Sequence, residues 1–261
     1  MKKGKVYLIG CGIGDPELLT IKALKSFKKL DIALIDHLIS DEIVELLPSK
    51  TKILYVGKQK GKLSVRQEDI NRIMYEFAKE GLTVGRLKSG DPYVFGRGGE
   101  EALYLLDKGI EVEVIPGVSS GITVPLYAGI PVVMRGYATG FSIVSAHLQG
   151  NRFNKDWIHL LKIKKHTVVV LMGLSRVSEI LNEAKRQDID LEIPIAIISN
   201  GSRKNQKVLI GKLKDIIHLS KEAEKPAVIV FGEVVNLHYK LPNLKTENLK
   251  IFKGEVELWK S

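Results

Sequence analysis

The sequence predicts an α/β protein of two consecutive α/β/α domains, with a mostly parallel sheet in the first domain and a mixed sheet in the second. Short, continuous apolar runs alternate with amphipathic helical runs over the first ~115 residues, a pattern typical of a parallel sheet covered on both faces. A second series of β-prone runs follows residue 140, with helical runs between some of them. We place the boundary near residue 120, which gives 1–120 and 121–261 as the two domains.

The composition of the chain excludes several classes of protein. A formal net charge of +10 over 261 residues suits an acidic partner, such as a polyanionic small molecule, a nucleic acid or a membrane surface. The single cysteine, Cys11, excludes an intramolecular disulfide and favours a reducing, cytoplasmic location. The six histidines form no pair at metal-ligand spacing, and no apolar run approaches a membrane-spanning length, so we expect neither a metal site nor a membrane span.

The first strand and its turn are similar to a dinucleotide-binding motif. Val6–Ile9 is a continuous apolar run, and Gly10–Gly14 turns the chain before a helical repeat that ends near Phe27. Asp15 can cap that helix, but it occupies the position of the motif's third glycine, where a carboxylate would repel a pyrophosphate. The turn alone therefore gives little support for a nucleotide site.

The second and third strands are followed by side chains that can carry chemistry. Ile32–Ile35 ends at Asp36, and Ile53–Val56 is followed at one residue's distance by Lys58. A carboxylate at a strand end can bind a ribose, act as a base or cap a turn, and a lone lysine there is usually solvated. Arg66–Lys79 then carries apolar residues at helical spacing.

The longest glycine-rich loop lies between a strand at Thr83–Leu87 and a helix at Glu100–Leu106. Its glycines permit positive φ angles and the close approach of a ligand, and Asp91 and Arg97 add a carboxylate and a guanidinium. Loops after parallel strands bind ligands in open α/β sheets, and loops of this length in compact domains are usually functional. We therefore predict a binding loop, followed by a fifth strand at Glu111–Ile115.

The second domain follows another glycine-rich turn, Pro116–Gly121, and a short helix at Ile122–Ala128. The strands expected in it are Phe141–Ala146, Thr167–Met172, Ile195–Ser199, Lys207–Ile210 and Ala227–Phe231. Helical runs are expected at Ser175–Lys185 and Lys212–Leu219.

Several motifs, in order and at compatible spacing, together resemble the tetrapyrrole methylases, a family of S-adenosylmethionine-dependent methyltransferases. They are Val6–Thr20, Asp36–Ser40, Val56–Gly61, Arg86–Glu101, Pro116–Ser120 and Tyr127–Pro131. The loop Gly90–Glu101 is the most specific of them. The resemblance implies a cofactor in the cleft between two α/β domains, a homodimer, and a small-molecule tetrapyrrole substrate with no nucleic-acid or membrane partner.

The same resemblance implies a reaction and the residues that carry it. The reaction would be the C-methylation of uroporphyrinogen III, in two successive transfers that give precorrin-2 for sirohaem and cobalamin synthesis. Asp36 and Lys58 would form an acid–base pair, and Arg97 would lie on the substrate side. The contacts implied for S-adenosylmethionine, and for its product S-adenosylhomocysteine, are Ile13, Ser89, Gly90, Asp91, Val94, Ser119, Ser120, Met172 and Gly201.

Two other functions stay open at this point. The net charge also suits a related methyltransferase that acts on a macromolecule such as RNA, or on a later corrin intermediate, although the Gly90–Glu101 loop counts against it. The Gly10–Gly14 turn leaves room for a nucleotide-binding module or a dinucleotide oxidoreductase, against which Asp15 counts.

Overall fold

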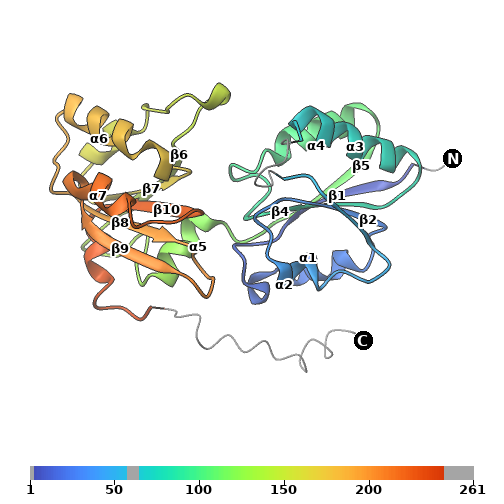
Figure 1. The fold of residues 1–261 in the computed structure, drawn as a ribbon, viewed down its shortest axis with the longest axis horizontal. Coiled ribbons are helices and arrows are strands. Elements are labelled where there is room, and N and C mark those ends of the chain that lie inside the picture. The colour runs from blue at the N-terminus through green and yellow to red at the C-terminus, as the bar shows by residue number, and fades with distance from the viewer. Residues whose placement is uncertain (1–2, 58–64, 244–261) are drawn as a thin grey trace.

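The structure is a computed structural model that describes residues 3–57 and 65–243. These residues form two α/β halves, each built on its own five-stranded sheet, and Figure 1 shows the halves side by side. The first sheet is wholly parallel and the second is mixed, so the predicted fold class is confirmed. No helix within the described ranges has both the length and the apolar character needed to cross a membrane.

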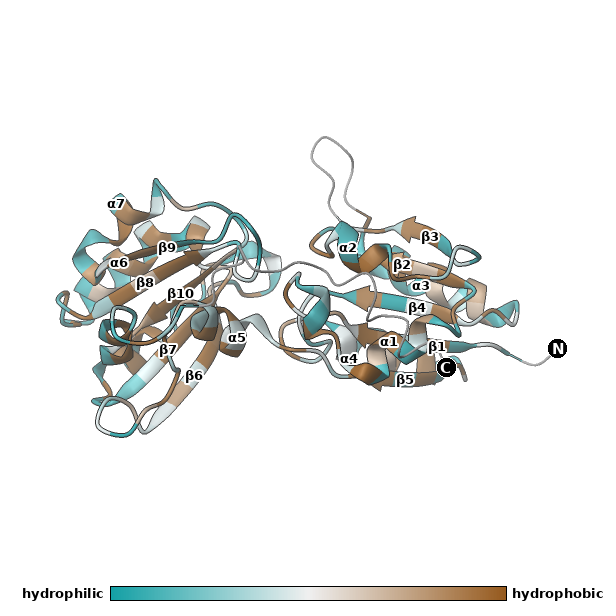
Figure 2. Ribbon diagram, turned by 90° about the horizontal axis from the view of Figure 1, so that it is seen from below, coloured by the Kyte–Doolittle hydropathy of each residue, from teal (hydrophilic) through white to brown (hydrophobic). Residues whose placement is uncertain are grey.

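The strands of the first sheet lie in the order β3-β2-β4-β1-β5. They are β1 (Lys5–Gly10), β2 (Ile32–Ile35), β3 (Lys52–Tyr55), β4 (Val84–Lys88) and β5 (Glu111–Ile115). Burial on both faces explains why β1 and β2 are continuous apolar runs. The central strand β4 differs, because it buries the charged Arg86 and Lys88, and Figure 2 shows hydrophilic, teal segments along it.

Right-handed crossovers distribute the helices over the two faces of this sheet. The chain moves from β1 to β2 and β3 in one direction, and α1 (Ile21–Phe27) and α2 (Asp41–Val44) cover one face. It then returns to β4 and continues to β5, so α3 (Gln67–Lys79) and α4 (Gly98–Asp107) cover the opposite face. Figure 1 shows α3 and α4 above the sheet and α1 and α2 below it. All five strands consequently direct their carboxyl ends to one edge.

The first helical segment differs from the sequence prediction, because a short 3-10 helix, Pro16–Leu18, precedes α1. Asp15 caps the 3-10 helix by accepting a hydrogen bond from the Glu17 amide at 2.9 Å. Thr20 caps α1 by accepting one from the Ala23 amide at 3.1 Å. Two side-chain caps so close together divide the segment. The helix α2 is absent from the sequence prediction, since its four residues are too few to show a helical repeat.

The second sheet has the order β6-β7-β10-β8-β9, in which β6 and β7 are parallel and the other pairs are antiparallel. Its strands are β6 (Gly140–Ser145), β7 (His166–Leu171), β8 (Pro194–Ser199), β9 (Lys207–Lys212) and β10 (Ala227–Phe231). Its helices are α5 (Ser120–Tyr127), α6 (Val177–Arg186) and α7 (Ile216–Ser220), with 3-10 turns at Gln149–Asn151, Ile158–Lys162, Leu174–Arg176, Leu213–Asp215 and Glu233–Leu237. The predicted strands of this half are confirmed to within two residues.

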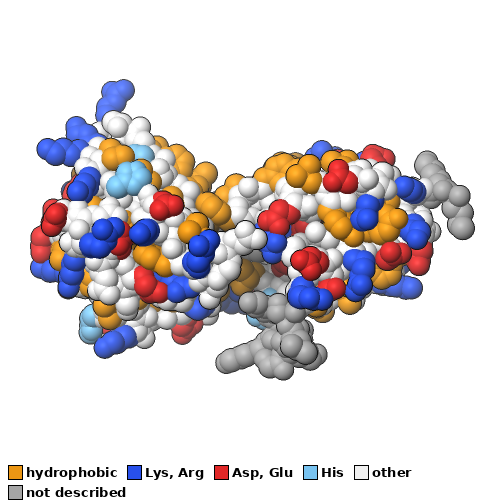
Figure 3. All heavy atoms as spheres, turned by 90° about the horizontal axis from the view of Figure 1, so that it is seen from above, with side chains coloured by type: hydrophobic (Ala, Val, Ile, Leu, Met, Phe, Trp, Pro, Cys, Tyr) orange, Lys and Arg blue, Asp and Glu red, His pale blue; other side chains and the backbone are white. Residues whose placement is uncertain are grey.

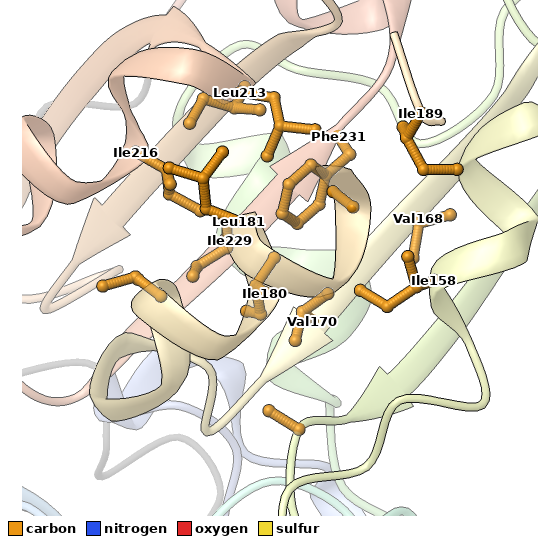
Figure 4. Packing of buried hydrophobic residues seen from close by; sticks show 14 of the residues in the cluster. Ile158, Val168, Val170, Ile180, Leu181, Ile189, Leu213, Ile216, Ile229 and Phe231 are labelled. Carbon is orange, nitrogen blue, oxygen red and sulfur yellow. The ribbon is translucent and has the colours of Figure 1, made fainter. Parts of the chain in front are cut away.

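Each face of the second sheet has its own hydrophobic core. On one face, Ile180 of α6 and Ile216 of α7 pack in a cluster with Phe231 of β10, as Figure 4 shows. The core on the other face contains Val124 of α5 and also Ile13, which belongs to the turn after β1. The first half thus contributes a side chain to the core of the second half, which fixes the two sheets relative to each other.

Polar contacts reinforce this junction between the halves. The Tyr127 hydroxyl on α5 donates to the buried Asp15 carboxylate at 3.0 Å. Ser202, after β8, donates its hydroxyl to the Ile13 carbonyl at 3.3 Å, and Arg203 donates to the Leu38 carbonyl at 2.8 Å. The loops at the carboxyl ends of β1 and β2 are therefore held against the second half.

Candidate active site

Three glycines bring the loops after β1, β4 and β5 into backbone contact. A Cβ atom on Gly10 would lie 2.4 Å from the backbone nitrogen of Gly117, and a Cβ atom on Gly117 would lie 2.3 Å from the carbonyl oxygen of Gly90. No side chain fits at such distances, so these loops meet because the residues are glycines. The contact lies at the sheet edge where open α/β proteins bind their ligands.

Gly90 borders open space on its other side. Its amide donates to the Gly12 carbonyl at 2.6 Å, and the Gly12 amide donates to the Gly90 carbonyl at 3.3 Å. Its φ of +74° lies in the left-handed region, and a Cβ atom built on it would meet nothing within 4 Å. A side chain at this position would occupy the space next to the backbone, which is the geometry required where a ligand lies against the main chain.

Asp91 fixes the loop after β4 to the loop after β5. Its carboxylate accepts hydrogen bonds from the backbone amides of Tyr93, at 2.8 Å, and Gly117, at 3.1 Å. Phe95 and Arg97 in the same loop have φ angles of 54° and 59°, a left-handed conformation that is strained for residues other than glycine and is often found at functional sites. The Asp91 carboxylate therefore joins the loop after β4 to the loop after β5. A contact between Asp91 and a cofactor stays a prediction.

A cavity of about 990 Å³ lies beside the glycine loops, at the carboxyl ends of β2, β3 and β4. The polar and charged side chains that line it include Asp36, Arg66, Arg86, Lys88, Ser89 and Arg97 from the first half and Gln149 from the second. Ser89 directly precedes Gly90, so the cavity adjoins the open space beside the Gly90 backbone. The arrangement offers two neighbouring spaces, one walled by backbone and one lined by side chains of both charges.

A chain of ion pairs runs along the wall of this cavity. Arg86 binds Asp36 through Nη2 at 2.5 Å and Glu101 through Nε at 3.1 Å. Lys88 lies 2.9 Å from the second oxygen of Glu101. Burial opposes the charge of Arg86, but the carboxylates of Asp36 and Glu101 outweigh it and raise the pKa of Arg86. Burial, with the neighbouring Arg86 charge, lowers the pKa of Lys88.

Arg97 lies at the rim of the cavity and is held by its own helix. Its guanidinium donates to Glu100 from Nη2 at 2.5 Å and from Nε at 3.1 Å, and about half of the side chain, 54%, is exposed. The hydrogen bond from Arg97 lowers the pKa of the Glu100 carboxyl and raises that of Arg97. Arg97 is therefore a permanently charged, half-exposed side chain whose Nε and Nη2 groups are engaged by Glu100.

Four predicted cofactor contacts lie at the start of α5 or beyond it in the chain. Ser119 caps α5 by accepting from the Gly121 amide at 3.3 Å, and Ser120 is the first residue of that helix. Met172, after β7, has a φ of 59°, and its carbonyl bonds to His147 at 3.1 Å. Gly201 faces α5, where an added Cβ atom would lie 2.6 Å from the Val124 side chain.

The structure separates the predicted site residues into groups. Asp36, Ser89 and Arg97 line the cavity, and Gly90 adjoins it. Val94 lies in the same loop, where its amide bonds to the Asp91 carbonyl at 3.3 Å. The Ile13 side chain is 6% exposed and packs in the core of the second half, which favours a backbone contact. Lys58 lies outside the described residues.

Sequence reasoning missed Arg86 and Lys88 of the cavity wall, and also the fully buried Glu101 that pairs with both. A signal for two of them exists, because Arg86 and Lys88 stand at alternate positions of a strand that is otherwise apolar and buried, and so point to the same face. Glu101 has no such signal, since it follows Glu100 at a helix start where exposed acidic residues are common. Within residues 3–57 and 65–243, no group of three or more His, Cys, Asp or Glu could hold a metal ion.

Comparison with known proteins identifies relatives of this chain over almost its whole length. A uroporphyrinogen-III C-methyltransferase from Methanocaldococcus jannaschii is 49% identical over 240 residues, which are 90% of this chain and 98% of that relative. A siroheme synthase from Photobacterium profundum is 42% identical over 239 residues, 92% of this chain and 51% of that protein. The chain thus spans about half the length of that longer relative.

Solved structures agree with the sequence comparison. The uroporphyrin-III C-methyltransferase of Thermus thermophilus, complexed with S-adenosylhomocysteine, superimposes with a TM-score of 0.77 at 37% identity, over 90% of this chain and 94% of that one. The family model that matches residues 5–217 is that of the tetrapyrrole (corrin/porphyrin) methylases. By sequence and by fold, the chain belongs to the tetrapyrrole methylases.

Proposed function

We propose that this protein uses S-adenosylmethionine to C-methylate uroporphyrinogen III, in two successive transfers that give precorrin-2. The observation that carries the proposal is a cavity of about 990 Å³, lined by four basic and three acidic side chains, beside a backbone-walled space at the same sheet edge. The relative that is 49% identical over nearly both full lengths is a uroporphyrinogen-III C-methyltransferase, which supports the same substrate here. The product would supply sirohaem or cobalamin synthesis, and the resemblance to siroheme synthases supports the first of these.

The glycine loops fit the cofactor. The open space beside Gly90 can accept a ligand in contact with the main chain, and the neighbouring Gly10 and Gly117 leave no side chain in the way. Ser119, Ser120 and Val94 lie on the adjoining loops, and Met172 and Gly201 would complete the contacts from the second half. When bound, S-adenosylmethionine supplies an activated methyl group, so the main task of the protein is alignment, which can contribute about 7–11 kcal/mol to lowering the barrier.

The cavity fits a polycarboxylate tetrapyrrole. Arg66 and Arg97 are exposed cations on its lining, and a guanidinium is a suitable partner for a substrate carboxylate. Figure 3 shows basic (blue) and acidic (red) side chains interspersed on the first half near the waist between the halves. The net charge of +10 favours the attraction of an acidic substrate over a distance.

Asp36 is the residue that we assign to proton transfer. After the methyl group is transferred to a pyrrole carbon, the ring carries extra positive charge until the macrocycle loses a proton. A carboxylate at the cavity wall can accept that proton or stabilise that charge, and general bases typically contribute about 10²–10⁴-fold. Lys58, the proposed partner of Asp36, follows β3 and lies outside the described residues.

Mass analysis after incubation with uroporphyrinogen III and labelled S-adenosylmethionine tests this function. We expect two labelled methyl groups per tetrapyrrole, with a singly methylated species at early times. The rate of methylation should be the same with and without added RNA. Tight binding of NAD(P) together with no binding of S-adenosylmethionine would instead favour an oxidoreductase.

We propose in addition that the protein is a cytoplasmic homodimer of two-domain subunits, divided near residue 120. The packing of α5 against β7 and β10 supports a boundary just before that helix. Exposed apolar residues on α4 and α5, such as Leu103 at 65% and Leu126 at 52%, support an interface between copies. Light scattering at micromolar concentration would measure the mass, and a monomer would contradict the dimer.

A further inference from the structure

A buried ionic cluster connects the interior of the first half to Asp36. Glu101 on α4 is fully buried, and its Oε1 accepts hydrogen bonds from Arg86 Nε at 3.1 Å, Lys88 Nζ at 3.0 Å and Gln67 Nε2 at 2.9 Å. The other end of the Arg86 guanidinium, Nη2, donates to Asp36 Oδ1 at 2.5 Å. Arg86 therefore spans two carboxylates, one inside the helix packing and one at the cavity.

Stability alone gives a poor reason for this cluster. Buried ions lose their hydration, and a buried ion pair often stabilises a fold no more than apolar side chains of similar volume would. The same face of α4 carries Leu105, one turn after Glu101, and Leu105 packs in a hydrophobic cluster. Of the four ionic side chains, Asp36 is the one with substantial exposure, 29%, against 0–3% for the others. The cluster thus leads to one accessible carboxylate in the cavity wall.

We propose that Glu101 is a positioning residue for Asp36 and acts through Arg86. This inference rests on the proposed function, because it requires that Asp36 acts on the substrate. The guanidinium is planar and rigid, so a carboxylate that fixes its Nε edge also fixes the direction of its Nη2 edge. Lys88 and Gln67 hold Glu101 in turn. With Oδ1 bound to Arg86, Asp36 keeps one rotamer and leaves Oδ2 for the substrate.

The substitution Glu101→Gln tests the proposal, because it keeps the size of the side chain and removes its charge. We expect kcat to fall about 10–100-fold, while KM for S-adenosylmethionine and the affinity for S-adenosylhomocysteine stay at parental values. In an Asp36→Asn background the same substitution should lower kcat by less than about threefold, since the group that it positions is already lost. A merely structural role would lower kcat by the same factor in both backgrounds.

Leu105→Ala is the matched control for destabilisation of α4, because Leu105 is fully buried on the same helix and is not part of the cavity lining. It should lower the melting temperature at least as much as Glu101→Gln does, and its effect on kcat should be equal in the parent and Asp36→Asn backgrounds. If Glu101→Gln does not fold, Arg86→Lys replaces it, because an ammonium keeps the charge and cannot span both carboxylates. Arg86→Lys should show the same non-additivity with Asp36→Asn.

The outcomes separate this inference from the function on which it rests. Parental turnover by Asp36→Asn alone would remove Asp36 from the proposed chemistry. Impaired turnover by Asp36→Asn, with an equal loss from Glu101→Gln in both backgrounds, would overturn the positioning role and leave the function in place. Loss of S-adenosylhomocysteine binding in Glu101→Gln would also overturn it, since the defect would then lie in the cofactor compartment.

Discussion

The Asp91 carboxylate accepts a hydrogen bond from the Gly117 amide at 3.1 Å and so joins the loop after β4 to the loop after β5. The two residues are 26 positions apart in the chain, and the strand between them in the sheet, β1, contributes Gly10 to the same contact. Both loops border the compartment that we assign to the cofactor. The spacing of the two loops therefore depends in part on this charge-assisted hydrogen bond, together with the glycine contacts beside it.

The variant Asp91→Asn should weaken cofactor binding. An amide in place of the carboxylate keeps one oxygen acceptor and turns an N–H group toward a backbone amide, which leaves a donor without its acceptor. Such a loss costs about 1–3 kcal/mol, so we expect the Kd of S-adenosylhomocysteine to rise roughly five- to 150-fold in calorimetry. An unchanged Kd would show that the loops hold their spacing without this bond.

The variant Gly90→Val should abolish cofactor binding without unfolding the protein. The valine side chain would fill the open space beside the backbone. The φ angle at this position, +74°, is strained for a residue other than glycine. Gly136→Val is the matched control, because Gly136 also has a positive φ, +90°, and open space around its Cβ position, and it is not among the cavity-lining residues. We expect native circular dichroism in both variants and loss of S-adenosylhomocysteine binding in Gly90→Val alone.

The variant Arg97→Ala should weaken substrate binding and leave cofactor binding unchanged. Loss of one charge-assisted pair with a substrate carboxylate costs about 1.5–3 kcal/mol, which corresponds to a rise in KM for uroporphyrinogen III of roughly ten- to 150-fold. Arg186→Ala removes a comparable pair, Arg186–Glu183, from the surface of the second half and serves as the control. Equal KM values for the two variants would exclude Arg97 from substrate binding.

The variant Asp36→Asn should lower kcat with a smaller effect on KM. The charge that Asp36 is proposed to act upon develops only as the methyl group is transferred, so the carboxylate would stabilise the transition state more than the bound substrate. We expect a fall in kcat of about 10²–10⁴-fold at saturating cofactor. Turnover at the parental rate would show that Asp36 pairs with Arg86 but takes no part in the reaction.

The pH dependence of stability should report on Glu113 of β5. Hydrogen bonds from Lys5 and Lys22 lower the pKa of Glu113 to about 2, below the unfolded value of about 4.3. The stabilisation is therefore present above about pH 4.3 and is lost as the pH falls through about 2. Glu113→Gln should lower the free energy of unfolding at pH 7 by about 0.2–1 kcal/mol, and the difference from the parent should vanish near pH 2 in urea titrations. A constant difference over this range would contradict the assignment.

The order of the elements and the position of the site could be predicted from the sequence. Continuous apolar runs specify buried strands through local composition, and glycines such as Gly90 mark turns through their backbone freedom, so both signals are readable without a fold. The parallel arrangement then places the loops after the strands at one edge, which is why Asp36 and Arg97 were predicted for one site and both line the cavity.

The sequence by itself thus determined the class of fold, the glycine loops and the family, because each depends on a local pattern or on motifs in order. Only the tertiary structure decided which strands are neighbours and which charges are buried. β4 lies between β1 and β2, a non-local pairing that brings Arg86 to Asp36, and helix packing turns Glu101 inward while Glu100 stays outside. No local pattern encodes these contacts, because the free energy of burying a charge depends on partners that are distant in the chain.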